Sequence, residues 1–304
     1  MPSSLSLKHF WLALAVVAVW GSNFAIIKVA LGQMPPLLLA ALRFALVVFP
    51  MVFLIRRPLV SWFNLAAYGL CIGVGQFGIL FIAMNGHISP GLASLVIQIQ
   101  VFFTIGVVMK QTGESLRRVQ WLALGLAASG LGVIALQTDG STTLLGLALT
   151  LVAALSWAAG NVVSRGAGQI NMVAYVVWSS LFAVPPLIFL ALWVEGWVPV
   201  RQALLGASAM TWLAVGWQAW GNSLFGYAAW SWLLSRYSAA TITPMALLVP
   251  LFGMGASSWY LDEALPLWKL SATALVMAGL AVNLLWPLWV QRHKGVLPSH
   301  QVDR

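Results

Sequence analysis

The chain has 304 residues, of which 61% are hydrophobic and only 7% are charged, and its mean hydropathy is +0.94. Soluble proteins average about 45–50% apolar and about 25% charged residues, so this composition excludes an ordinary soluble globular protein. A membrane-spanning helix takes roughly 20 apolar residues, and ten such helices would use about 200 residues. The length therefore leaves no room for a large soluble domain.

Ten apolar runs follow one another, separated by polar residues, glycine or proline. Such runs predict α-helices, because backbone polar groups in lipid must be hydrogen-bonded within the segment, and the alternating pattern of barrel strands is absent. The first run follows Lys8 and His9 but is too long for a signal peptide, so we expect a retained span. The predicted spans cover residues 10–30, 36–55, 64–85, 90–110, 120–137, 144–164, 172–194, 208–234, 239–260 and 267–290.

The net charge of +9 is spread singly or in pairs between the apolar runs. This spacing is typical of cytoplasmic loops, where Lys and Arg collect, and it argues against a nucleic-acid partner. An N-terminus on the cytoplasmic side puts eleven basic residues inside and three outside, which predicts ten spans with both termini cytoplasmic. The inner set is Lys8, Arg56, Arg57, Lys110, Arg117, Arg118, Arg165, Arg236, Arg292, Lys294 and Arg304, and the outer set is Lys28, Arg201 and Lys269.

The two halves of the chain resemble each other. A Trp–small–Asn pattern at Trp20 to Asn23 returns at Trp157 to Asn161. Several further residues match at one fixed offset of 149 positions, and an acidic-x-Leu element after the fourth and ninth spans is the clearest of them. The matched pairs are Ser94 with Thr243, Phe103 with Phe252, Glu114 with Glu263, Leu116 with Leu265, and Gly130 with Gly279.

We interpret these matches as an internal duplication of five spans. Because five is odd, the second copy must insert with the opposite orientation. Inverted repeats in transporters place the substrate site near the bilayer midplane, where it opens alternately to each side. The sequence thus predicts an all-α integral membrane protein of ten transmembrane helices, with a first repeat at 10–137, a second repeat at 144–290 and a cytoplasmic tail at 291–304.

Two basic residues fall inside predicted spans, where a charge costs on the order of 3 kcal/mol and needs a partner or a cavity. Lys28 lies near the outer end of the first span, and Arg43 lies about one-third of the way into the second. The short turn between these spans brings both cations toward one surface, so they are candidates to bind a substrate carboxylate. Alternatively, Lys28 extends to the outer interface and Arg43 binds helix-end carbonyls.

Uncharged polar and aromatic side chains within the spans form a second set of candidates. Amides bind both ammonium and carboxylate groups, although they also join helices structurally. Gln98 and Gln100 are two apart on a helix, so at most one of them is expected to face a shared cavity. Deep tryptophans either wall a cavity or pack. The candidates are Asn23, Gln76, Gln98, Gln100, Trp157, Asn161, Trp178 and Asn222.

No Asp or Glu lies within a predicted span, so a carboxylate proton relay has no candidate and we expect transport without obligatory proton coupling of that kind. Lys28 is the one residue that could support coupling if it lost its proton. The single cysteine, Cys71, excludes a disulfide or thiolate metal site within one chain. We expect no metal and no cofactor, and the sequence leaves open whether the chain forms a homodimer.

Ordered motifs over residues 10–290 resemble the EamA family of the drug/metabolite transporter superfamily. They are Trp20 to Phe24, Ile27-Lys28, Met34 to Pro36, Leu42 to Phe44, Phe49-Pro50, Pro90 to Leu95, Gly113-Glu114, Ser156 to Asn161, Leu247 to Pro250 and Asp262-Glu263. The resemblance implies two inverted five-helix repeats in the bacterial inner membrane. It also implies export of a small amino-acid-like substrate, such as cysteine or O-acetylserine.

Two other functions are weighed against this one. A multidrug or other metabolite exporter on the same scaffold would need a wider aromatic or a more cationic cavity. An intramembrane enzyme would need converging His, Asp, Glu or Cys side chains within the spans, and only Cys71 and His87 are candidates. Transport of a small metabolite across the lipid bilayer is therefore the favoured prediction.

Overall fold

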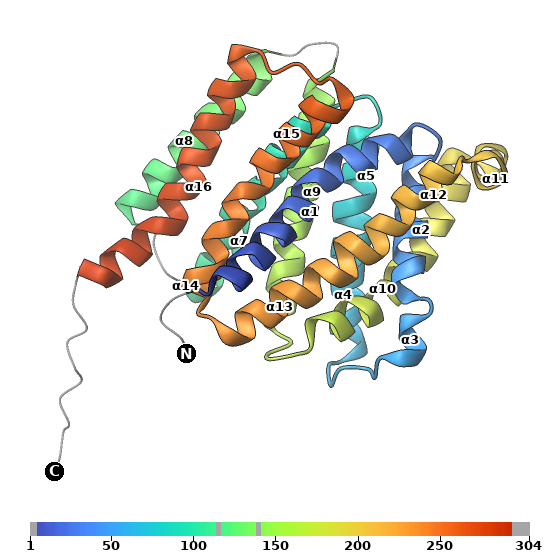
Figure 1. Ribbon diagram of the computed structural model, residues 1–304, viewed down its shortest axis with the longest axis horizontal. Helices are drawn as coiled ribbons and strands as arrows, with labels where there is room; N and C mark the ends of the chain where they lie inside the picture. The colour runs from blue at the N-terminus through green and yellow to red at the C-terminus, as the bar shows by residue number, and fades with distance from the viewer. Residues whose placement is uncertain (1–4, 114–116, 138–140, 294–304) are drawn as a thin grey trace.

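The computed structural model describes residues 5–113, 117–137 and 141–293, and these residues contain helices and no β-strand. The helices pack lengthwise into one bundle, with their connections at its two ends (Figure 1). The start of α1 and the end of α16 lie toward the same end, shared with α3 and α14 (Figure 1). Glu114, Leu116 and the tail beyond residue 293 lie outside the described residues.

The first half forms five helical rods. The third contains a π-helical segment and the fourth a 3₁₀ turn, while the second is broken by a turn at Phe49 and Pro50. In chain order the elements are α1 (Leu7–Leu31), α2 (Pro36–Val48) with α3 (Met51–Leu54), α4 (Trp62–Gly69) with η1 (Leu70–Gly78) and α5 (Ile79–Met84), α6 (Pro90–Val96) with η2 (Ile97–Ile99) and α7 (Gln100–Thr112), and α8 (Arg118–Leu136).

The second half repeats this order, again with a π segment in its third rod and a 3₁₀ segment in its fourth. It adds the short helix α11, which no predicted span covers because this helix is too short to cross a membrane. The elements are α9 (Leu144–Arg165), α10 (Met172–Leu190) with η3 (Ala191–Glu195), α11 (Trp197–Gly206), α12 (Ala209–Gly216) with η4 (Trp217–Phe225) and α13 (Gly226–Arg236), α14 (Ala239–Ile242) with η5 (Thr243–Leu248) and α15 (Val249–Leu261), and α16 (Leu267–His293).

Nine helical stretches of the described chain are long and apolar enough to cross a membrane, and they coincide with nine of the ten predicted spans. The protein is therefore an all-α, multi-pass membrane protein. The remaining predicted span, 208–234, forms the unbroken helical rod α12–η4–α13. Its Trp, Gln, Asn and Ser residues lower its hydropathy, so the count of ten spans stays a prediction.

Helix contacts follow the two-repeat pattern. α1 packs along α15, and α9 packs along α7. These two contacts are equivalent, because the first helix of each half packs against the fourth rod of the other half. In the same way, α9 packs against the rod α4–η1–α5, and α1 packs against the rod α12–η4–α13. The pairs α2–α10 and α8–α16 each join equivalent helices of the two halves, and α8 and α16 stand together at one edge (Figure 1). This arrangement is what an inverted repeat requires.

Glycines allow the closest of these contacts. A Cβ atom added at Gly130 on α8 would lie 2.6 Å from the Cγ2 of Val276 on α16. A Cβ atom added at Gly279 on α16 would lie 2.5 Å from the carbonyl oxygen of Ala123 on α8. Small residues let membrane helices approach closely, so the match of Gly130 with Gly279 in the sequence has a packing reason.

Candidate functional site

The described part of the chain holds a deeply buried pocket around Arg43, between the rods that contain α2, η1, α10 and η4. The side chain of Arg43 is 1% exposed. Space for the centre of a water molecule amounts to about 10 Å³ there, which is enough for roughly one water, so the pocket is contracted in this conformation. Its lining consists of Arg43, Phe44, Tyr68, Gly69, Ile72, Gly73, Phe77, Val176, Ser179, Ser180, Ser223 and Tyr227.

Arg43 is an under-satisfied cation. Its Nη2 donates to the Oγ of Ser223 at 3.0 Å, and its guanidinium carbon lies 3.7 Å from the centre of the Phe77 ring. Nε and Nη1 have no hydrogen-bond partner among the described residues, and no carboxylate lines the pocket. Buried charges are normally paired, and a cation–π contact replaces only part of a lost ion pair. The guanidinium therefore keeps donors available for an anion.

The π segment η4 positions Ser223, whose hydroxyl oxygen accepts the hydrogen bond from Arg43. Ser223 Oγ donates its proton to the carbonyl oxygen of Gln218, five residues earlier, at 3.0 Å. This bond leaves the oxygen lone pairs of Ser223 directed to accept from Arg43. π-helical segments inside α-helices occur frequently at functional sites. On the facing rod, the π segment η1 contributes Gly73 and Phe77 to the same pocket.

Lys28 lies elsewhere. Its Nζ donates to the carbonyl oxygen of Met84 at 3.3 Å, at the C-terminal end of α5. A cation is favourable at that end of a helix because the unpaired carbonyls carry partial negative charge. The expectation that Lys28 and Arg43 share one surface is not met: the two cations have different partners, and Lys28 does not line the Arg43 pocket.

A second polar group joins α7 and α9. The Nδ2 of Asn161 donates to the Oε1 of Gln100 at 2.8 Å and to the Oγ1 of Thr104 at 3.3 Å. Gln98, two residues before Gln100, lies half-buried on η2. Gln100 and Asn161 thus bind each other across the two helices, as the structural alternative for amides describes.

The other candidates are distributed over the bundle, away from the lining of the Arg43 pocket. Asn23, Gln76 and Asn222 are buried, and Asn23 Oδ1 has no hydrogen-bond partner among the described residues. The main-chain oxygen of Asn222 accepts from Trp20 at 3.1 Å. Trp157 packs against the hydrophobic core, and the Nε1 of Trp178 donates to the carbonyl oxygen of Ile55 at 2.9 Å.

Sequence reasoning missed most residues that surround Arg43. Tyr68 and Phe77 line the pocket but carry no charge, and nothing in a single sequence distinguishes them from packing residues. Ser179 and Ser180 line the pocket as well. The adjacent serines in an otherwise apolar span were the one available sign. Both now lie opposite Arg43 from α10, with Ser180 Oγ donating to the carbonyl oxygen of Val176 at 2.6 Å.

Both halves of the chain resemble a known family of membrane proteins. The sequence pattern of the EamA-like transporter family matches residues 7–136 and 144–285, one match in each half of the chain. The chain belongs to the EamA-like transporter family. The resemblance seen in the sequence motifs is thereby confirmed, and the duplicated helical bundle is the two-repeat fold of this family.

Relatives of this EamA family member include two bacterial proteins that match it over nearly their full length. One, from Salmonella typhimurium, is 40% identical over 92% of this chain and 96% of its own length, and is named a probable amino-acid metabolite efflux pump. The other, from Escherichia coli, has the same name and is 38% identical over 94% of this chain and 97% of its own length.

Two further similarities have lower sequence identity. An uncharacterized inner membrane transporter of Escherichia coli, YedA, is 28% identical over 80% of both chains. A solved crystal structure superposes with a TM-score of 0.60 at 18% sequence identity, covering 93% of this chain and 99% of the other. At that identity the superposition establishes the shared fold alone.

Proposed function

We propose that this protein exports small amino acids and their metabolites, of the cysteine and O-acetylserine type, across the bacterial inner membrane by alternating access. The relatives named as probable amino-acid metabolite efflux pumps support the substrate class. The relative named as an inner membrane transporter supports the location. The positive-inside pattern supports placing both termini in the cytoplasm.

The under-satisfied guanidinium of Arg43 is the observation that carries the proposal. An amino acid or its O-acetyl ester offers one carboxylate, and the planar fork of arginine binds a carboxylate through two parallel hydrogen bonds. The free donors on Arg43 are Nε and Nη1. Around them stand hydroxyls and aromatic rings with no second cation, which suits a single carboxylate better than a diphosphate.

A small, contracted pocket also favours a small substrate over a drug. The space of about 10 Å³ beside Arg43 must expand to admit a substrate, and a small amino acid requires less expansion than a drug-sized solute. Binding pockets of drug-sized ligands reach roughly 300–1,000 Å³. We therefore favour metabolite export over the multidrug alternative.

The remaining polar candidates are proposed to line the path or to receive the substrate amino group. Amide oxygens accept hydrogen bonds from an ammonium group, and several of these candidates carry an amide. Lys28 is proposed as a second cation on the path, nearer the predicted outer end. The candidates are Asn23, Lys28, Gln76, Gln98, Gln100, Trp157, Asn161, Trp178 and Asn222.

The test is transport by the purified full-length protein in proteoliposomes. Vesicles loaded with unlabelled cysteine or O-acetylserine should take up the labelled compound by exchange. Cysteamine, which is cysteine without its carboxylate, is the matched control and should neither exchange nor compete. Exchange of cysteamine at the rate of cysteine would contradict a carboxylate site. Exchange of a lipophilic cation alone would replace the proposal with multidrug export.

A further inference from the structure

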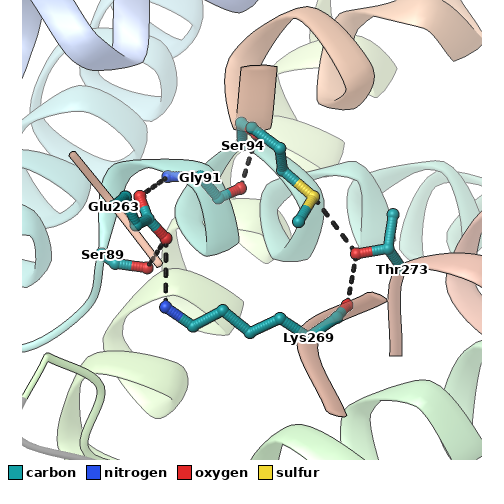
Figure 2. Close-up of polar contacts among 7 residues, drawn as sticks. Ser89, Gly91, Ser94, Glu263, Lys269 and Thr273 are labelled. Atoms are coloured by element: carbon teal, nitrogen blue, oxygen red, sulfur yellow. Dashed lines mark hydrogen bonds and ion pairs between the residues drawn. The ribbon is translucent and has the colours of Figure 1, made fainter. Parts of the chain in front are cut away.

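A buried cluster of polar groups ties the two repeats together at the end of the bundle that the charge pattern predicts to be outer. Glu263, just after α15, accepts hydrogen bonds from the Oγ of Ser89 and, at 2.9 Å, from the backbone N–H of Gly91 (Figure 2). Lys269, at the start of α16, forms an ion pair with it at 3.2 Å. We name Ser89, Gly91, Glu263 and Lys269 the Glu263 latch.

The latch supplies a helix cap that α6 lacks. The side chain of Ser89, which precedes α6, caps none of its N–H groups and instead donates to Glu263. Unpaired N–H groups at a helix start carry partial positive charge, so a carboxylate is favourable there. Glu263 of the second repeat thus caps α6 of the first repeat, by bonding to Gly91, which lies 172 residues earlier in the chain.

Tight packing lies directly beneath the latch. Every residue of α6, Pro90–Val96, is buried. A Cβ atom added at Gly253 on α15 would lie 2.3 Å from the Oγ of Ser94, and one added at Gly91 would lie 3.0 Å from the Glu263 carboxylate. The contact between α6 and α15 therefore closes this end of the bundle.

Among the residues that the structure describes, the opposite end shows no packing equivalent to that of α6 on α15. In the two repeats, α6 is equivalent to α14–η5, and α15 is equivalent to α7. The contact equivalent to α6–α15 would therefore join α14–η5 to α7. Among the described residues no comparable packing joins these elements. No residue of η5 is buried, and none of α7 whose burial is described is buried either. The packing of α6 on α15 beside the latch therefore has no counterpart among the described residues of the other end, where the repeats meet through other helices such as α1 and α13.

We propose that the Glu263 latch holds the predicted outer end closed, and that its release is a step of the transport cycle. The inference rests on the proposed alternating-access function. Opening this end would expose the Glu263 carboxylate, the Lys269 ammonium and the first N–H groups of α6 to water, which solvates all of them. A polar latch next to the aqueous side is therefore reversible, whereas the same charges left unpaired in an apolar interior would be costly.

The repeat supplies two matched reporters for a test. Ser94 on α6 is buried, and its repeat partner Thr243 on η5 is half-exposed. Cys71 is the single cysteine, so Cys71→Ser followed by Ser94→Cys or Thr243→Cys gives one thiol per molecule. A membrane-impermeant maleimide is applied to right-side-out and to inverted vesicles, without substrate.

Glu263→Gln should raise the labelling rate of the Ser94→Cys thiol from the outer side roughly tenfold and lower that of the Thr243→Cys thiol from the inner side. A tenfold change corresponds to about 1.4 kcal/mol, which is close to the lower bound of about 1.5 kcal/mol for a hydrogen bond to a charged group. Ser89→Ala removes one hydrogen bond of the latch and should shift both rates in the same directions, by less.

Glu195→Gln is the matched control. Glu195 also caps a helix at this end, accepting from the backbone N–H groups of Leu37 and Leu38 on α2. It joins the α2–α10 pair, whose members are equivalent in the two repeats, so neither labelling rate should change. An unchanged Ser94→Cys rate in Glu263→Gln, a rise at both reporters, or the same reciprocal shift in Glu195→Gln would overturn the latch. Because no substrate is present, these results are independent of whether cysteine is exported.

Discussion

Replacing Arg43 by methionine should separate transport from stability in this protein. The substitution removes the hydrogen bond to Ser223 and the contact with the Phe77 ring, and it removes a buried charge whose Nε and Nη1 have no partner. Methionine fills a similar volume with flexible, apolar atoms. The site loses its cation without gaining a large cavity.

The effect on substrate binding follows from the free donors. Two charge-assisted hydrogen bonds from Arg43 to a carboxylate contribute about 1.5–3 kcal/mol each. Losing both costs at least about 3 kcal/mol, which corresponds to a weakening of binding of about 100-fold or more. Arg43→Lys keeps the charge but loses the planar fork, so a weakening of about tenfold is expected.

Arg43→Met weakens substrate binding, but it should leave the stability of the fold unchanged or raise it. The lost cation–π contact is worth about 0.5–2 kcal/mol and the lost hydrogen bond to Ser223 a similar amount. Against these stands the cost of burying an unpaired charge, which amounts to several kcal/mol. We therefore expect Arg43→Met to unfold at the wild-type temperature or above it.

Two measurements on the same detergent-purified samples check this prediction. Thermal unfolding with and without cysteine reports stability and ligand binding together, because a ligand that binds only the folded state raises the unfolding temperature. Exchange of labelled cysteine in proteoliposomes reports transport. Arg43→Met should keep its unfolding temperature, lose the shift caused by cysteine and lose exchange. Exchange within threefold of wild type would refute the carboxylate role of Arg43. Loss of exchange together with a lower unfolding temperature would assign Arg43 to packing.

Three further predictions concern packing, capping and coupling. Gly130→Ala should lower stability by about 1–3 kcal/mol, because its Cβ would meet Val276, whereas Gly132→Ala, with no atom within 4 Å, should be neutral or slightly stabilising. Thermal unfolding of the pair distinguishes them, and equal values would contradict the α8–α16 contact. Glu195→Ala should cost about 1–2 kcal/mol through the lost cap of α2, measured in the same way. Exchange of cysteine should not follow an imposed pH gradient, and a flux that did would direct attention to Lys28.

Regular features of this fold are readable from the sequence. Nine of the predicted spans coincide with apolar helices of the described chain, because each must satisfy its own backbone in lipid. The match of Gly130 with Gly279 corresponds to reciprocal close contacts between α8 and α16. Arg43 was recognised as exceptional because a charge inside an apolar run is costly wherever it finally lies.

The sequence does not predict the direction in which each polar side chain points. The π segments η1 and η4 add residues to a helical turn, so every side chain after them is rotated relative to a regular helix. Gln76 and Asn222 lie in these segments, and neither lines the Arg43 pocket. Their neighbours Phe77 and Ser223 line it instead. A pattern based on a constant helical period cannot predict that choice.

The sequence repeat also shows how the surroundings of equivalent positions differ between the two ends of the bundle. Ser89 and Ser238 are related by the same offset of 149 that relates Ser94 to Thr243. Ser89 is buried against Glu263, whereas Ser238 is exposed and forms a hydrogen bond with its neighbour Thr241. Equivalent positions in the two repeats thus have unequal surroundings. A substrate can shift the protein between this arrangement and one in which the unequal surroundings are exchanged only by as much as it binds one of them more tightly than the other.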